Sequence, residues 1–287
     1  MSRDKPVAGR VVAVTGGGRG IGREIARQLV LAGASVAVGD RDGSAARHTA
    51  RELGPRVLGL DLDVADTESF AAFLTAVADQ LGPVEVLVNN AGVMWVGPFG
   101  AEPEAATRQQ VEVNLLGVIR GVQLAAPAMA ARGCGHIVTV ASAASLLTTP
   151  GEATYAATKH GVHGYLKAVR EELRHTGVEI SVIMPAVVDT ELATGTSTGA
   201  ARLLQPSDVG RVVVATIQRP RFEVSIPRYL DPVNRLVNLL PTPVRDTLLR
   251  QLVPNQVEQA DRLARAAYEA QFGPPELTRG RYRPRAK

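Results

Sequence analysis

Seven short apolar runs, most of them rich in β-branched residues, recur along the first 227 residues, and longer segments with helical periodicity separate them. The expected strands are 11–15, 35–39, 57–61, 84–88, 137–141, 179–184 and 222–226. Such apolar runs are typical of parallel strands that are covered on both faces. Strands that alternate with helices predict an α/β fold: a doubly wound, Rossmann-type parallel sheet of about seven strands with helices on both faces.

The helical segments carry their own start and stop signals. The first helix is expected to open near Gly22 and to stop at Gly33, because glycine is favoured just past a helix end. Asp66 is a favourable N-cap for a later helix, and Pro103 is an allowed first-turn residue of the longest one. In the segment 154–175 the apolar residues recur on one face of a helix.

The composition is that of an ordinary globular protein, with 45% hydrophobic and 21% charged residues. The one cysteine, Cys134, cannot form an intrachain disulfide, which fits a reducing compartment, so we expect a cytoplasmic protein. The N-terminal residues lack the apolar core of a secretory signal. The longest apolar stretch, 29–38, is far shorter than the roughly 20 residues of a membrane-spanning helix.

A glycine-rich segment, TGGGRGIG at 15–22, follows the first expected strand and leads into the first helix. Glycine lets the backbone turn tightly and approach a phosphate, and the N-terminus of the following helix attracts negative charge. Gly16, Gly20 and Gly22 form a G-x-x-x-G-x-G pattern, which differs from the commoner G-x-G-x-x-G. In this context the segment predicts a dinucleotide-binding loop.

Asp40 follows the second expected strand, where an acid accepts hydrogen bonds from the adenosine ribose. A carboxylate there repels a 2′-phosphate and favours NAD over NADP. Arg19 in the loop and Arg41 beside the acid can each pair with such a phosphate. We give the acid more weight, because an uncompensated carboxylate at the ribose is hard to offset, and predict NAD as the cofactor with NADP as the alternative.

Further motifs follow in a fixed order. They are DV at 63–64, NNAG at 89–92, Asn114 in VEVNLLG, Ser142 in IVTVASAAS, YAATK at 155–159 and PAVVDT at 185–190. Together with the glycine loop, their order and spacing resemble the short-chain dehydrogenase/reductase family over about residues 8–227. The resemblance implies an NAD(P)-dependent oxidoreductase that acts on CH–OH groups.

The resemblance also implies a catalytic tetrad of Asn114, Ser142, Tyr155 and Lys159. Tyrosine has an ordinary pKa of about 10 and is a poor base at neutral pH. Lys159 lies four residues further on, on the same helix face, and its charge favours the phenolate. We therefore expect a lowered pKa for Tyr155, which would act as general acid and base. By family analogy, Ser142 hydrogen-bonds the substrate oxygen, Lys159 also bonds the nicotinamide ribose, and Asn114 holds a proton-relaying water.

The family pattern implies further cofactor contacts, from the adenine end at Asp63 to the nicotinamide end at 185–190. The expected cofactor-binding residues are Gly16, Arg19, Gly20, Ile21, Gly22, Asp40, Arg41, Asp63, Val64, Asn90, Ala91, Gly92, Tyr155, Lys159, Pro185, Val188 and Thr190. Ala186 stands where the family usually has glycine, and alanine there costs energy if the backbone needs a positive φ.

The expected substrate-pocket segments, 93–99, 145–150 and 191–204, consist largely of apolar or small residues, and the last is typical of a mobile lid. Since they carry no basic cluster for an anionic substrate, they indicate a lipophilic secondary alcohol or ketone. The five histidines show no metal-ligand spacing, so we predict no metal and place His160 and His163 on a helix surface.

The chain beyond residue 227 is basic, with 11 Lys+Arg and 6 Asp+Glu; its balance of +5 leaves about −1 of the total +4 for the rest. No basic face on a nucleic-acid-reading fold is visible, and we expect no nucleic-acid partner. We divide the chain into a catalytic domain at 1–227, a helical extension at 228–272 packed on it, and a disordered tail at 273–287.

Two leucine-bearing helical runs separated by Pro241 and Pro243, then an amphipathic helix at 256–271, are expected in the extension. The leucines are Leu236, Leu239 and Leu240 in the first run and Leu248, Leu249 and Leu252 in the second. Three roles are open: a cap on the substrate site, a contact between subunits, or a peripheral contact with an acidic membrane surface. The small residues Ala156, Ala157 and Gly161 favour a homodimer or homotetramer.

Two classes of function follow. The first is an NAD-linked oxidoreductase. The second is a non-catalytic dinucleotide sensor or scaffold on the same fold. The complete set of Asn114, Ser142, Tyr155 and Lys159 favours the enzyme, because a sensor has no need of it.

Overall fold

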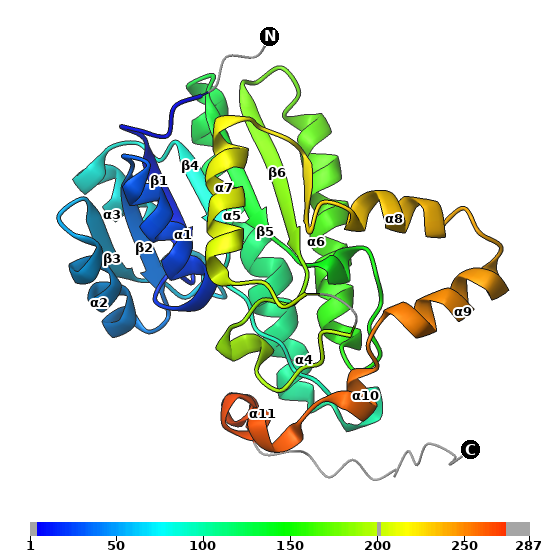
Figure 1. The fold of residues 1–287 in the computed structure, drawn as a ribbon. Helices are drawn as coiled ribbons and strands as arrows, with labels where there is room; N and C mark the ends of the chain where they lie inside the picture. Colours follow the sequence, from blue (N-terminus) through cyan, green and yellow to red (C-terminus); the bar gives the residue numbers. More distant parts are fainter. Residues whose placement is uncertain (1–4, 200–201, 274–287) are drawn as a thin grey trace.

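The computed structural model describes residues 5–199 and 202–273, and its centre is one parallel sheet (Figure 1). The strands are β1 (Val11–Thr15), β2 (Ser35–Asp40), β3 (Val57–Asp61), β4 (Val86–Asn89), β5 (Gly135–Val140), β6 (Val178–Pro185) and β7 (Glu223–Ile226). They lie in the order β3-β2-β1-β4-β5-β6-β7, and every neighbouring pair is parallel. The predicted doubly wound sheet is confirmed.

Helices cover both faces of the sheet. They are α1 (Gly20–Leu31), α2 (Gly43–Leu53), α3 (Thr67–Leu81), α4 (Glu104–Gln110), α5 (Gly117–Ala131), α6 (Ala153–Glu172) and α7 (Pro206–Gln218). The expected signals hold: Gly33 has a φ of +92° just past α1, and the Asp66 carboxylate caps α3 by accepting from the backbone N–H groups of Glu68 and Ser69.

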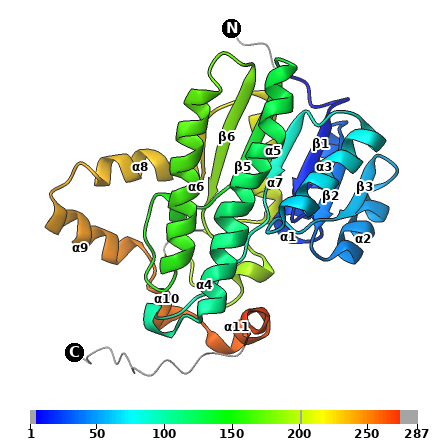
Figure 2. The ribbon, with the colours of Figure 1, turned by 180° about the vertical axis from the view of Figure 1, so that it is seen from behind.

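Adjacent residues of one strand enter different cores because successive side chains point to opposite faces. Ala13 of β1 packs in the core beneath α3, α5 and α6, whereas Val12 and Val14 pack beneath α1 and α7. Figure 1 shows α1 and α7 in front of the sheet, and Figure 2 shows α5 and α6 on the other side. The apolar strands are thus buried on both faces, as their composition predicts.

The helix expected from Pro103 begins one residue later, at Glu104, with Pro103 as its N-cap. A π-helical turn, Val111–Leu116, joins α4 and α5 into 28 continuous residues, Glu104–Ala131. By length and composition alone this is the one described helix that could cross a membrane. Val118, Val122 and Met129 of α5 are buried in the core under the sheet, so we interpret it as a core helix.

The C-terminal extension forms α8 (Leu230–Val237), α9 (Thr242–Leu252), α10 (Gln256–Gln259) and α11 (Arg262–Glu269). Helices α8 and α9 form an arm that leaves the body of the fold in both views, whereas α10 and α11 return to it (Figures 1 and 2). The single helix expected at 256–271 is wrong. Ala260 and Asp261 are non-helical, and the Asp261 side chain caps α11 instead. The predicted tail at 273–287 lies, beyond Gly273, outside the described residues.

Candidate active site

Two positions of the glycine loop require glycine because the backbone there leaves no room for a Cβ atom. Gly16 has a φ of +63°, and a Cβ on it would lie 2.8 Å from the Cα of Ala91. A Cβ on Gly22 would lie 2.1 Å from the carbonyl oxygen of Gly16. These close approaches fit a loop whose backbone meets a pyrophosphate at the N-terminus of α1.

The NNAG segment holds this loop in place. The Thr15 hydroxyl oxygen accepts hydrogen bonds from the backbone N–H groups of Asn90 and Ala91, at 3.0 and 3.1 Å. The Asn90 side-chain amide donates to the carbonyl oxygens of Thr15 and Gly16, both at 3.0 Å. The residues after β4 therefore brace the residues after β1 at the carboxyl edge of the sheet.

Asp40 lies at the end of β2 and faces the loop. Its carboxylate accepts from the backbone N–H groups of Gly18 at 2.9 Å and Asp42 at 3.0 Å. Of the two arginines that complicate the choice of cofactor, Arg19 forms an ion pair with Glu191 at 2.9 Å. Arg41, like Arg19, lines the cleft.

A cleft of about 250 Å³ runs along this edge. Among the expected cofactor residues it is lined by Gly16, Arg19, Gly20, Ile21, Gly22, Asp40, Arg41, Asp63, Val64, Asn90, Ala91, Gly92 and Thr190. The remaining ones, Tyr155, Lys159, Pro185 and Val188, line the adjoining cavity. Tyr268 and Gln271, from the C-terminal extension, also line the cleft, and the sequence analysis missed both because nothing local marks them.

The adjoining cavity has a volume of about 370 Å³ and a mostly apolar wall. Each expected pocket segment contributes residues to the lining of this cavity, such as Met94, Leu147 and Leu192. The C-terminal extension supplies a further wall. It consists of Tyr229 just before α8, Leu230, Val233, Asn234 and Val237 in α8, Leu249 and Leu252 in α9, and Val253, Pro254 and Gln256 after it. Ile21, Asn90, Gly92, Thr190 and Leu192 line both the cavity and the cleft, so the two meet.

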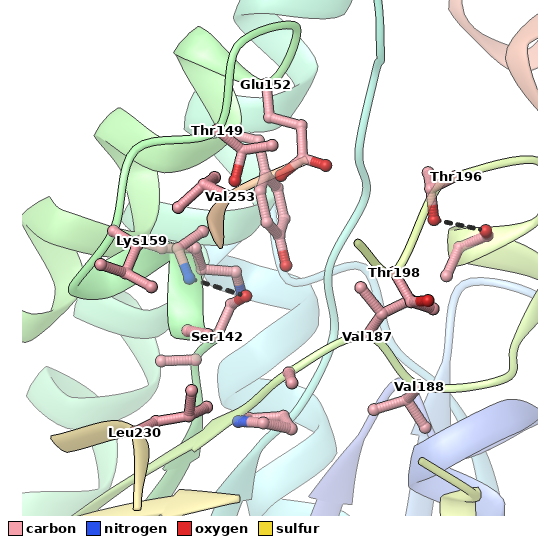
Figure 3. A pocket seen from close by; sticks show the side chains of 18 of the residues that line it. Ser142, Thr149, Glu152, Lys159, Val187, Val188, Thr196, Thr198, Leu230 and Val253 are labelled. Atoms are coloured by element: carbon pink, nitrogen blue, oxygen red, sulfur yellow. Dashed lines mark hydrogen bonds between the residues drawn. The ribbon is translucent and has the colours of Figure 1, made fainter. Parts of the chain in front are cut away.

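Tyr155, Lys159 and Ser142 gather at the wall of this cavity. Tyr155 is 8% exposed and Lys159 is 5% exposed. The Lys159 ammonium lies 5.4 Å from the centroid of the Tyr155 ring and donates to the carbonyl oxygen of Val140 at 3.4 Å. Ser142 follows β5 and lies near Lys159 in Figure 3. Its hydroxyl oxygen accepts from the Ala144 N–H at 3.1 Å.

Burial changes the pKa values of both central groups. It raises the pKa of Tyr155 above its ordinary value, and the carboxyl group of Glu152 adds to the rise, whereas a hydrogen bond with Ser142 opposes it. Burial lowers the pKa of Lys159 to about 8. The expected lowering of the Tyr155 pKa is therefore wrong for the protein groups alone. Helical spacing indicates that a charge is near, but it says nothing of the water that folding removes.

Asn114 lies in the π-helical turn and is fully buried. Its side-chain oxygen accepts from the Val93 N–H at 2.8 Å, and its NH₂ group donates to the Val93 carbonyl at 2.8 Å and to the Thr158 hydroxyl at 3.3 Å. It thus fixes the loop after β4 against α6. The relay water implied by the resemblance stays a prediction.

The segment after β6 does not need glycine at Ala186. Among the described residues His175 is the only non-glycine with a positive φ, so the suspected strain at Ala186 is absent there. The Ala186 N–H donates to the Ile226 carbonyl at 2.8 Å, which ties this segment to the end of β7.

Helix α11 fastens the segment that was expected to be a mobile lid. Arg265 is 1% exposed. Its guanidinium donates to the carbonyl oxygens of Leu192 at 3.1 Å, Thr194 at 2.9 Å and Met94 at 2.9 Å. It also pairs with Glu269 at 2.7 Å. A buried arginine on an otherwise exposed helix had no sequence signal, because its partners are backbone carbonyls of distant loops.

The histidines divide between the surface and the interior. His160 is exposed, as expected. His163 is 8% exposed and contacts Glu223 at 2.7 Å, so its expected surface position is wrong. Within residues 5–199 and 202–273, no group of three or more His, Cys, Asp or Glu residues could hold a metal ion.

Comparison with known proteins agrees with this site. The model of the short chain dehydrogenase family matches residues 10–201. A putative ketoacyl reductase from Streptomyces coelicolor is 36% identical over 228 residues, which are 77% of this chain and 85% of that protein. A crystal structure of a short-chain dehydrogenase/reductase from Burkholderia phymatum in complex with NAD has a TM-score of 0.76 at 26% identity, and covers 88% of this chain and 98% of that one.

A metagenomic short-chain oxidoreductase in complex with NADP has a TM-score of 0.67 at 32% identity, and covers 77% of this chain and 96% of that one. Both dinucleotides thus occur among similar structures. The family match spans the glycine loop, the Tyr155–Lys159 pair and all cleft residues except Tyr268 and Gln271. This chain belongs to the short-chain dehydrogenase/reductase family.

Proposed function

We propose that this protein is an NAD-dependent oxidoreductase that interconverts a lipophilic secondary alcohol and its ketone, with Tyr155 as general acid and base. One observation carries the proposal. Tyr155, Lys159 and Ser142 line an apolar cavity that opens into the dinucleotide cleft through shared residues such as Gly92 and Thr190. A carbonyl carbon placed beside Tyr155 is therefore within reach of a nicotinamide placed beside Thr190.

The chain's own residues supply the proton chemistry. When bound, the nicotinamide cofactor supplies or accepts the hydride. Because burial raises its pKa, the Tyr155 phenol is protonated at neutral pH and can donate to a substrate carbonyl. Lys159, with a pKa of about 8, keeps its charge at neutral pH and stabilises the phenolate that remains. Ser142 can hydrogen-bond the same substrate oxygen.

The substrate class follows from the wall of the cavity. Its side chains are mostly apolar, and the arm adds Leu230, Val233, Val237 and Leu249 to the segments expected from the sequence. A wall of this kind binds the hydrocarbon part of a ligand, and a few polar groups fix the orientation of the ligand. The ketoacyl reductase name of one relative fits ketone reduction.

Tyr155→Phe should reduce kcat by roughly 10²–10⁴-fold, the usual contribution of a proton-transfer group, because only that group is lost. NADH affinity should stay within about twofold of the wild-type value. Lipophilic ketones and secondary alcohols would be screened with both dinucleotides, and NADH binding would be followed by its fluorescence.

Tyr165→Phe is the matched control, since Tyr165 lies on the same helix and lines neither the cavity nor the cleft. Retention of more than about a tenth of kcat by Tyr155→Phe would contradict the proposed role. A wild-type protein that binds NADH but converts nothing would favour the sensor.

A further inference from the structure

A carboxyl group without a partner lies in the wall of the proposed substrate cavity. Glu152 directly precedes α6, is 8% exposed and lines the cavity. Its backbone is satisfied: its N–H donates to the Thr149 carbonyl at 3.1 Å, and its carbonyl accepts from the Ala156 N–H at 2.8 Å. For its side-chain oxygens there is no hydrogen-bond partner among the residues that the structure describes. Figure 3 shows the side chain beside Thr149, at the same wall as Ser142 and Lys159.

The side chains of Arg265, Gln256 and Thr196, which lie in the same part of the molecule, are bonded to other groups. Arg265 is the cation whose charge acts on Glu152, but it directs its hydrogen bonds to Glu269 and to three backbone carbonyls. Gln256 uses both ends of its amide on the backbone of Ser197, at 2.8 Å each. Thr196 donates to the Ala193 carbonyl at 2.7 Å. None of these groups is therefore committed to the Glu152 carboxyl.

Burial of a carboxyl group is costly unless the group finds a hydrogen-bond partner, and Glu152 lines the cavity, where a bound substrate can supply one. Burial raises the pKa of Glu152 to about 7, with Arg265 acting in the opposite direction, so both protonation states are present near neutral pH. Both states accept a hydrogen bond from a hydroxyl group. The positive charge of Arg265 would repel an ammonium group on the substrate, and the negative charge of ionised Glu152 would repel an anionic group.

We propose that Glu152 determines specificity by accepting a hydrogen bond from a second hydroxyl group of the substrate. This inference rests on the proposed function and narrows its substrate class to lipophilic hydroxyketones and the corresponding diols. Glu152 directly precedes α6, and Tyr155 lies in the first turn of that helix, where the charge of Glu152 acts on the Tyr155 phenol. The second hydroxyl group therefore lies a few bonds from the reacting carbon.

The test compares ketones that differ in one group. Suitable probes are decalones with one hydroxyl at different ring positions, the parent decalone, the O-methyl ethers and the amines. With wild-type protein, at least one hydroxydecalone should exceed the parent in kcat/KM by roughly 10–100-fold, the range for a hydrogen bond to a charged group. Its O-methyl ether, which cannot donate, should lose that advantage.

Two variants assign the preference to Glu152. In Glu152→Leu the ratio of kcat/KM for hydroxydecalone to that for decalone should fall to near one. Glu152→Gln, which keeps an acceptor oxygen, should retain part of the preference. Glu172→Gln, an exposed change at the far end of α6, is the charge control and should leave the ratio unchanged. Calorimetric binding of the same pair of ketones to the NAD-loaded protein gives a readout without turnover, because the oxidised dinucleotide has no hydride to transfer to a ketone.

The outcomes separate this inference from the proposed function. If ketones are reduced but no hydroxyl position gives a preference, or if the preference survives in Glu152→Leu, the role of Glu152 is wrong and the proposed function stands. If the amines are preferred over the alcohols, the hydroxyl assignment is wrong. If nothing is reduced with either dinucleotide, the proposed function fails, and the binding ratio alone decides the role of Glu152.

Discussion

Tyr155, Lys159 and Glu152 are all removed from water, and burial moves each pKa toward the neutral form of its group. The consequences differ. In the reaction that we propose, a protonated phenol donates its proton to the ketone, so burial of Tyr155 suits that role. Lys159 stays mostly charged at neutral pH because its pKa falls only to about 8. Glu152 crosses from neutral to charged near pH 7, and its charge raises the pKa of Tyr155 further.

Glu152→Gln should change how stability depends on pH. The folded protein holds the Glu152 proton up to about pH 7, whereas the ordinary value is 4.5. Below pH 4.5 Glu152 is protonated in both the folded and the unfolded protein and does not lower the free energy of unfolding. As the pH rises from 4.5 toward 7, the wild-type protein loses stability, because only the unfolded chain releases the proton. The loss relative to Glu152→Gln should approach roughly 3 kcal/mol.

Urea unfolding of wild type and Glu152→Gln between about pH 5 and about pH 8 measures this difference. The Glu172→Gln variant, whose carboxylate is exposed, should follow the wild type. A constant difference between wild type and Glu152→Gln across the range would show that Glu152 ionises in the folded protein as easily as in the unfolded chain.

Asp40→Asn should narrow the preference for NADH over NADPH. The change removes the charge that we propose repels a 2′-phosphate. It keeps a side-chain oxygen for one of the N–H groups of Gly18 and Asp42, which bond to different oxygens of Asp40. Arg41 is then the better placed cation, because Arg19 is paired with Glu191. Fluorescence titration with both reduced dinucleotides measures the ratio, and Asp61→Asn, at the exposed end of β3, is the control. Equal wild-type affinities would mean that the arginines outweigh Asp40.

At the scale of elements, α11 joins two loops that the sheet presents separately. Arg265 bonds the loop after β4 through Met94 and the segment after β6 through Leu192 and Thr194. The same helix places the Tyr268 hydroxyl to accept from the Met94 N–H at 3.2 Å. Tyr268 of α11 and Gln271, just after this helix, also line the dinucleotide cleft, so α11 contacts both the cleft and the loops beside the cavity.

Arg265→Ala should lower the free energy of unfolding by roughly 3 kcal/mol, since it leaves Glu269 and three carbonyls without their partner. It should also weaken NADH binding and raise KM for ketones. Leu263→Ala is the matched control, because Leu263 lies on the same helix and is 89% exposed. Thermal unfolding and NADH titration measure both effects. Unchanged NADH affinity together with a lowered unfolding temperature would leave α11 a purely structural role.

At the scale of the whole molecule, the arm is both a wall of the cavity and an exposed apolar surface. Val237 is buried, whereas Leu236, Leu239 and Val244, which do not line the cavity, are 53% exposed or more. The cavity-lining side chains of Tyr229, Val233 and Leu252 are also 43% exposed or more. Arg228, Arg235, Arg245 and Arg250 outnumber Asp231 and Asp246 over the same stretch. Apolar helices with such a basic excess are typical of contact with an acidic membrane surface.

We expect the arm to bind vesicles that contain anionic lipid and to release them when Leu236 and Leu239 are both changed to Asp. These side chains are 65% and 81% exposed, so the change should leave NADH affinity intact. Vesicle sedimentation with anionic and neutral lipid, together with solution mass, measures the effect. If the wild-type protein does not bind vesicles and the double variant has a lower solution mass, the exposed apolar side chains of the arm pack between subunits instead.

The homodimer or homotetramer expected from the sequence stays a prediction, with less support from the small residues of α6. Ala156 is 4% exposed and belongs to a core cluster with Tyr155 and Met94. A Cβ on Gly161 would lie 3.3 Å from Leu115 of the same chain. These two residues therefore serve packing within the chain, and Ala157 alone of the three is exposed.

The sequence by itself determined the sheet, its strands and the residues that gather at its carboxyl edge. Those features depend on local signals: apolar runs, glycines that a close backbone approach requires, and residues that follow strands of a parallel sheet, which must share one edge. The tertiary structure alone decided the sign of the pKa change at Tyr155, the unpartnered Glu152, and the return of Arg265 and Tyr268 to the site. Burial and contacts between residues 170 or more positions apart, such as Arg265 with Met94, depend on where the whole chain packs, and no local pattern records them.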